Sequence, residues 1–134
     1  YFDAYYKKAL QVRTLVIRDM ERVMQQCDAI LGPVAPTTAY KLGEKTASPL
    51  EMYLGDIYTV PVNIAGIPAL SLPCGTDSRG LPVGVQLMGP TFSEPMLYRI
   101  GAALERCEAE KKPLARSCAA VAVSAGIALV ILMV

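Results

Sequence analysis

Residues 55–89 decide the fold, and their sequence is GDIYTVPVNIAGIPALSLPCGTDSRGLPVGVQLMG. It has the pattern of a short apolar helix followed by two buried strands, and Gly or Pro marks each boundary. Asp56 stands at the start of the helix, and residues 57–76 behind it carry no charged side chain. Since an unpaired charge inside a protein costs several kcal/mol, such a run belongs to a core. Asp56 is therefore expected either to cap the helix or to bind a ligand.

Three apolar runs are predicted to be strands of one sheet, namely residues 29–32, 69–73 and 83–88. Continuous apolar character is typical of strands that are covered on both faces. The sequence TDSRG between the second and third runs favours a tight turn, so these two strands are expected to pair antiparallel within a mixed sheet. The loop that carries Pro33, Pro36, Thr37 and Thr38 follows the first strand, and such loops lie near ligand crevices in α/β folds.

Helices are predicted around these strands, over residues 3–26, 57–65 and 93–106. In the first and the third, apolar residues recur at spacings of three and four, which gives each helix one face to pack on the sheet. The middle helix contains Pro61, which is expected to distort or shorten it, and Gly66 is expected to end it. The pattern as a whole predicts an α/β fold with a mixed central sheet covered by helices.

The composition favours a segment of a larger core, because 53% of the residues are hydrophobic and only 19% are charged. Tyr1 lies within a helical pattern, so we expect a truncated N-terminus, and no signal peptide is recognisable. Thirteen basic and twelve acidic residues leave no electrostatic footprint for nucleic acid or acidic lipid. The four cysteines are scattered and no His is present, which predicts no metal site, no Ser-His or Cys-His nucleophile and a reducing, cytoplasmic compartment.

Several stretches together resemble the amidase signature family. The sequence DIYTVPVNIAGIPALSLPCG at 56–75, followed by GLPVGVQLMG at 80–89, is similar to the C-terminal part of its members. The stretches YFDAYYKKA at 1–9 and GEKTASPLEMY at 43–53 fit the glutaminase (A) subunits of tRNA-dependent amidotransferases within that family. The resemblance implies that residues 1–106 are part of an α/β/α sandwich, and it leaves residues 107–134 as a divergent apolar tail.

The resemblance also implies a function. Members of the family use a Ser–cis-Ser–Lys triad whose nucleophilic serine lies in a Gly/Ser-rich segment of G-G-S-S-G type, and this sequence has no such segment. We therefore expect the C-terminal fragment of a glutaminase subunit that is inactive alone, without catalytic residues or a cofactor of its own. The intact subunit would supply ammonia from glutamine to form Gln-tRNA(Gln) from Glu-tRNA(Gln). It would work with B and C subunits, of which one binds the charged tRNA and uses ATP and magnesium.

The resemblance assigns a role to Asp56 as well, which is to hold the α-amino group of the substrate glutamine. A carboxylate that faces an ammonium group in a partly desolvated pocket is chemically sensible. Tyr58 and Thr59 lie about one turn along the chain and are expected to line the same pocket. A purely structural role for Asp56, as a helix cap, remains the alternative.

Two other functions are compatible with the sequence. One is an amidase of the same family that acts on a different carboxamide, and the other is a membrane-attached or structural fragment without activity. Membrane contact is possible only through residues 118–134, which are uncharged and follow Lys111, Lys112 and Arg116. A helix of that length reaches about 25 Å, somewhat short of the roughly 30 Å hydrocarbon core. A non-native terminus, a tail anchor and a segment packed on the domain are all open, and we predict a helix from near Pro113 with few contacts to the rest.

Overall fold

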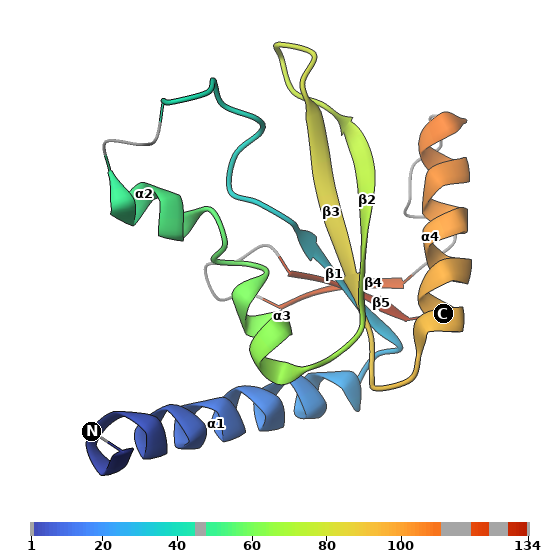
Figure 1. Ribbon diagram of the computed structural model, residues 1–134. Helices are drawn as coiled ribbons and strands as arrows, with labels where there is room; N and C mark the ends of the chain where they lie inside the picture. The colour runs from blue at the N-terminus through green and yellow to red at the C-terminus, as the bar shows by residue number, and fades with distance from the viewer. Residues whose placement is uncertain (1, 45–47, 111–118, 124–128, 134) are drawn as a thin grey trace.

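The computed structural model describes residues 2–44, 48–110, 119–123 and 129–133 (Figure 1). The elements follow in the order η1 (Phe2–Tyr6, a π-helical turn), α1 (Lys7–Met24), β1 (Ala29–Pro33), α2 (Pro49–Leu54), α3 (Val60–Ala65), β2 (Ala69–Thr76), β3 (Pro82–Met88), α4 (Glu94–Ala109), β4 (Ala119–Val123) and β5 (Leu129–Met133). The described strands form one sheet in the order β2-β3-β1-β5-β4. The three strands predicted from the sequence are therefore confirmed as members of a single sheet.

Strand pairing follows the predicted turn. β2 and β3 are antiparallel, with Leu70 opposite Leu87, and β1 runs antiparallel to β3, with Ile30 opposite Met88. The turn is closed by two backbone hydrogen bonds, one of which runs from the Asp77 N–H to the Leu81 carbonyl. Every pairing between described strands is antiparallel, so the parallel neighbour of a mixed sheet is not among these residues.

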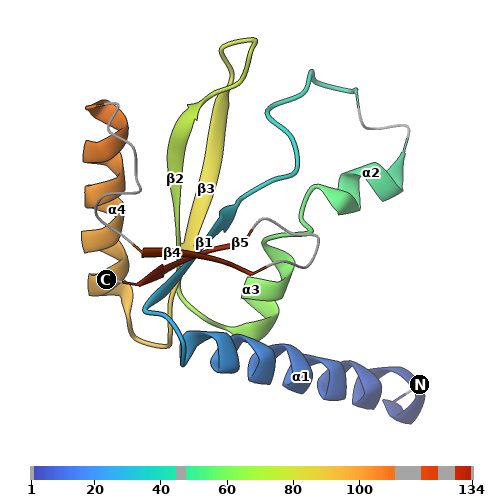
Figure 2. The same cartoon turned by 180° about the vertical axis from the view of Figure 1, so that it is seen from behind.

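Helix α4 covers one face of the sheet (Figure 2). Its Leu97 and Ile100 side chains form one core cluster with Ala29 of β1 and Leu87 of β3. Gly101 brings the helix close to β2, because a Cβ atom at this position would lie only 2.8 Å from the Leu70 Cδ2 atom. The helix predicted over 93–106 is thus confirmed in place and in the face that it buries.

The Leu87 side chain, which is completely buried, gives a direct test of this core. We expect Leu87→Ala to lower the free energy of unfolding by about 2–5 kcal/mol, through lost burial and the cavity that remains. Leu42, which is fully exposed, is the matched control, and Leu42→Ala should leave stability nearly unchanged. Urea denaturation followed by circular dichroism measures both, and equal effects of the two substitutions would contradict the assignment of the core.

Helices α1 and α3 lie on the opposite face, so that the layers follow the expected α/β/α order (Figure 1). Side chains of both helices take part in a second hydrophobic core cluster, which is centred on Ile30, Val62 and Met88. Only the last turns of α1 take part, and the rest of the helix runs clear of the sheet. Apolar side chains of η1 and of the first half of α1 are exposed, namely Phe2, Tyr5, Tyr6, Leu10, Val12 and Leu15.

The start of α3 differs from the prediction. A turn occupies residues 55–59, and the helix begins at Val60 rather than at Ile57. Pro61 therefore falls in the first helical turn, where its missing N–H and its fixed φ angle are tolerated. Gly66 ends the helix at a φ of 71°, as expected for a left-handed cap.

The tail also differs from the prediction. The structure gives two strands, β4 and β5, in place of a helix, and β5 pairs antiparallel with β1, with Ala29 opposite Leu132. The physical reason is that Val, Ile and Leu suit a strand, and β1 offers it a free edge to pair with. Pro113, from which the helix was expected, lies outside the described residues. No helix within the described ranges is long and apolar enough to cross a membrane.

Candidate functional site

The turn that carries Asp56 is held by its own backbone. The Asp56 carbonyl oxygen accepts hydrogen bonds from the N–H groups of Thr59 and Val60, at 3.1 and 3.0 Å, and from the Thr59 hydroxyl at 3.3 Å. The Asp56 carbonyl therefore accepts hydrogen bonds at the start of α3, and Thr59 occupies the N-cap position. Of the two alternatives for Asp56, the helix cap is therefore wrong, because Pro61 delays the start of the helix.

The Asp56 carboxylate therefore takes no part in capping α3. The residue is exposed, and within the described part of the chain its side chain has neither a hydrogen bond nor an ion pair. A carboxylate that serves no structural purpose on a well-bonded turn is suited to bind a cation or an ammonium group. The carboxylate is thus available to a ligand, and the ligand-binding alternative stays a prediction.

Tyr58 and Thr59 lie on the same turn as Asp56, and both are half-buried. The Thr59 carbonyl accepts from the Asn63 side-chain amide at 2.9 Å and from its backbone N–H at 3.1 Å. The Tyr58 carbonyl accepts from the side chain of Gln86 at 3.0 Å. The structure thus brings the three predicted residues together on one turn, with the backbone of two of them fixed by side-chain amides.

Sequence reasoning missed Gln86 as part of this site. Its side chain is only 3% exposed, and its Nε2 atom donates to the Pro33 carbonyl and to the Tyr58 carbonyl, both at 3.0 Å. The available signal was a single amide within the apolar run VGVQLM of a predicted buried strand. Buried polar groups are nearly always hydrogen-bonded, so such a residue marks a specific partner, although its identity follows only from the fold.

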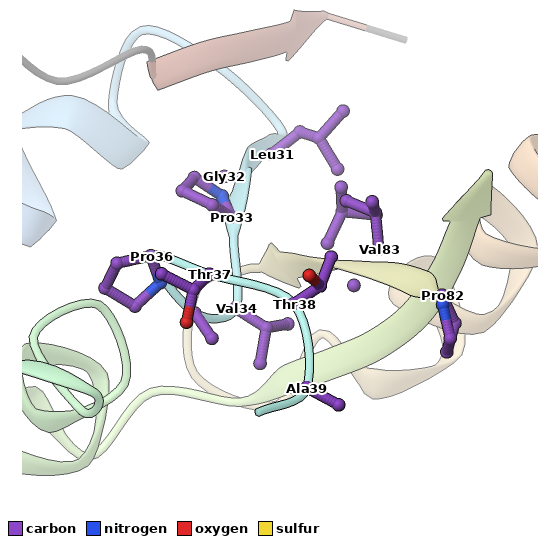
Figure 3. A pocket seen from close by; sticks show the side chains of 13 residues that line it. Leu31, Gly32, Pro33, Val34, Pro36, Thr37, Thr38, Ala39, Pro82 and Val83 are labelled. Carbon is purple, nitrogen blue, oxygen red and sulfur yellow. The ribbon is translucent and has the colours of Figure 1, made fainter. Parts of the chain in front are cut away.

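A cleft of about 580 Å³ opens beside the end of β1, where the sequence predicted a crevice (Figure 3). Residues 31–39 form one wall and residues 82–85 the other. Leu31 and Val83 contribute apolar surface, and Thr37 and Thr38 contribute hydroxyl groups. The cleft therefore suits a mainly apolar group that carries a few polar atoms.

A side-chain network fixes the loop that lines this cleft. The Thr38 hydroxyl donates to the Asp77 carboxylate at 2.7 Å and accepts from the Arg79 guanidinium at 2.8 Å. The carboxylate also accepts from the backbone N–H groups of Arg79 and Leu81, at 2.8 and 2.9 Å. The hydrogen bond from Thr38, followed by that from the Leu81 N–H, lowers the pKa of Asp77 to about 2. The β2–β3 turn and the loop after β1 are thereby joined.

The low pKa of Asp77 predicts how stability changes with acidity. The ordinary pKa of the group is 3.8, so the folded chain holds this proton less tightly than the unfolded chain does. The stabilisation is complete above that value and is lost as the pH falls through about 2. We expect Asp77→Asn to be less stable than the parent chain near neutral pH, and the difference to shrink in strong acid.

Urea denaturation at a series of acidic pH values measures this difference. Asp19→Asn, which removes an exposed carboxylate of α1 that contacts Arg22, is the matched control and should show little effect. A constant difference between Asp77→Asn and the parent chain across the acid range would show that the carboxylate charge does not stabilise the fold.

Comparison with known proteins extends these observations. The model of the Amidase family matches residues 1–98. The A subunit of glutamyl-tRNA(Gln) amidotransferase from Clostridium botulinum (strain Eklund 17B / Type B) is 60% identical over 106 residues, which are 79% of this chain and 22% of that protein. The corresponding protein of Caldanaerobacter subterraneus subsp. tengcongensis is 58% identical over the same coverage.

A solved structure agrees with this relationship. The crystal structure of the A subunit of glutamyl-tRNA(Gln) amidotransferase from Thermotoga maritima matches with a TM-score of 0.74 at 45% identity, over 79% of this chain and 23% of that one. The chain thus spans about a fifth of the length of the relatives it matches. The family match covers more than half of the chain, and the α/β/α layers agree with it. The chain belongs to the amidase family.

Proposed function

We propose that this chain forms part of the glutaminase subunit of a tRNA-dependent amidotransferase and supplies one wall of its glutamine site. The observation that carries the proposal is the unpaired carboxylate of Asp56, exposed on a turn in which the Asp56, Tyr58 and Thr59 carbonyls all accept hydrogen bonds. The names of the relatives and the 45–60% identity to them support the choice of this subunit over other amidases. An amidase for an apolar carboxamide would not require an anion at this position.

The chemistry of binding follows from charge. Free glutamine carries an α-ammonium group, and a charge-assisted hydrogen bond to the Asp56 carboxylate would hold it. Tyr58 and Thr59 would line the same wall, since they share the turn with Asp56. The carboxamide end of the substrate would then project toward groups contributed by the rest of the subunit, which would perform the hydrolysis.

The exposed apolar surface of α1 supports a place within a larger assembly. Leu10, Val12 and Leu15 are 43%, 58% and 59% exposed, and all three lie in the first half of the helix. Several large apolar side chains left exposed along one segment are typical of a surface that another part of a protein covers. In the proposed function the remainder of the subunit covers it. B and C subunits complete the complex in the cytoplasm, and ATP, magnesium and the charged tRNA are bound in a partner subunit.

A graft tests this function directly. Residues 1–106 of this chain replace the matched 106-residue segment of the Clostridium botulinum A subunit, and the chimaeric protein is purified with its partner subunits. We expect release of glutamate and ammonia from glutamine at a rate near that of the unmodified complex. A soluble, assembled chimaera without glutaminase activity would contradict the proposal.

A further inference from the structure

Gln86 occupies an unusual place for an amide. Its neighbours along β3, Leu87 and Met88, belong to the hydrophobic core, and Gln86 itself is the only polar or charged residue fully buried among the described residues. Both of its partners, Pro33 and Tyr58, offer carbonyl oxygens, which can only accept hydrogen bonds. The Nε2 atom must therefore face them, and its two hydrogens are both used.

These two hydrogen bonds connect segments that are far apart in the sequence. Pro33 is the last residue of β1 and is 53 positions from Gln86, and Tyr58 belongs to the turn after α2 and is 28 positions away. Among the described residues, no other hydrogen bond joins the turn 55–59 to a strand of the sheet. Gln86 is therefore the polar link through which the sheet fixes the place of this turn.

The link reaches Asp56 through the backbone. Asp56 lies two residues before Tyr58, and its carbonyl is bonded to the N–H groups of Thr59 and Val60, so residues 56–60 form one bonded unit. A hydrogen bond at the Tyr58 carbonyl thus helps to fix the backbone from which the Asp56 side chain projects. A displaced carboxylate would hold the substrate ammonium group less tightly, because a charge-assisted hydrogen bond weakens steeply once its distance and angle leave the favourable range.

We propose that Gln86 is a positioning residue for the glutamine site, holding the Asp56 turn at the end of β1 through the Tyr58 and Pro33 carbonyls. The identity of the substrate in this inference rests on the proposed function. The link between Gln86 and the turn rests only on the two hydrogen bonds of Gln86. Gln86 acts at a distance from the substrate and takes no part in bond making or breaking.

The first experiment measures the link in the complete 134-residue chain. Gln86→Met keeps the length of the side chain and removes both donors, and Gln86→Asn keeps the amide but shortens its reach by one methylene. We expect amide hydrogen exchange of residues 56–60 to accelerate about tenfold or more in Gln86→Met, beyond any change in the β2–β3 ladder, and less in Gln86→Asn. Exchange that accelerates equally in the turn and in the ladder, or in neither, would overturn the proposal.

The second experiment measures the consequence for the substrate in the graft. Gln86→Met should raise the KM for glutamine about tenfold or more and leave kcat within about threefold of the unsubstituted graft. In the Asp56→Ala background the same substitution should add little, because its effect passes through Asp56. Ser71→Ala is the matched control, since Ser71 lies opposite Gln86 on β2 and is exposed.

Two results of this second experiment would refute the positioning role. One is an unchanged KM in Gln86→Met, and the other is an effect that adds fully to that of Asp56→Ala. A general structural role would lower kcat and the melting temperature together instead of acting on KM. If the unsubstituted graft has no glutaminase activity, the proposed function fails, and the exchange measurement on the complete chain still decides whether Gln86 holds the turn.

Discussion

Asp56→Ala in the graft, the chimaera that carries residues 1–106 of this chain, is expected to raise the KM for glutamine about 30-fold or more. Removing one partner of a desolvated charge pair costs about 2–5 kcal/mol, and each 1.4 kcal/mol corresponds to a factor of about ten. The carboxylate has no structural partner among the described residues, so the melting temperature should stay nearly unchanged. Steady-state glutaminase kinetics and thermal unfolding of the same preparation separate the two effects.

A substrate analogue sharpens this prediction. Glutaramate, which lacks only the α-amino group of glutamine, should bind the unsubstituted graft weakly, and Asp56→Ala should then make little further difference. Glu51→Ala, which removes an exposed carboxylate in the first turn of α2, is the matched control and should leave the KM for glutamine unchanged. A KM for glutamine that does not change in Asp56→Ala would remove this residue from the site.

The isolated chain is expected to release no ammonia from glutamine above the rate without enzyme, whereas the graft is active. The sequence has no Gly/Ser-rich nucleophile segment and no His. The described lysines, Lys7, Lys8 and Lys41, are exposed and lie outside the kind of apolar pocket that a catalytic lysine needs. Measuring glutamate after long incubation with purified protein tests this expectation.

The control for that measurement is Ser71→Ala. Ser71 is exposed on the edge strand β2, and it lacks the sharp strand-to-helix turn and the adjacent base of a serine nucleophile. Any turnover in the isolated chain that disappears in Ser71→Ala would show that a nucleophile exists outside the expected segment, and it would contradict the present assignment of function.

The central sheet could be predicted because its signals are local. Continuous apolar runs indicated β1, β2 and β3, and the turn residues after Thr76 indicated the antiparallel pairing of the last two. The start of α3 was misplaced by about one turn, because Asp56 resembles a helix cap in sequence while Pro61 decides where the helix can begin. The local pattern contained both signals, and only the backbone geometry shows which of them prevails.

The tail and Gln86 show what local signals cannot supply. An apolar run of this length suits a helix or a strand, and the choice of strand depends on the free edge of β1, which lies far away in the chain. Gln86 likewise depends on carbonyl oxygens 28 and 53 positions away. The resemblance led to Asp56 by its place in a motif, and Tyr58 and Thr59 followed from their nearness to it in the chain. The residue that holds their turn became visible only through contacts.

The exposed apolar side chains of α1 have a consequence for the fate of the chain in a cell. Leu10, Val12 and Leu15 present the kind of surface by which molecular chaperones and proteases recognise incompletely assembled proteins. The lifetime of the chain would then depend on how quickly a covering partner is found, more than on the stability of its own core. A substitution on this helix could change how much protein accumulates without altering how tightly glutamine is bound.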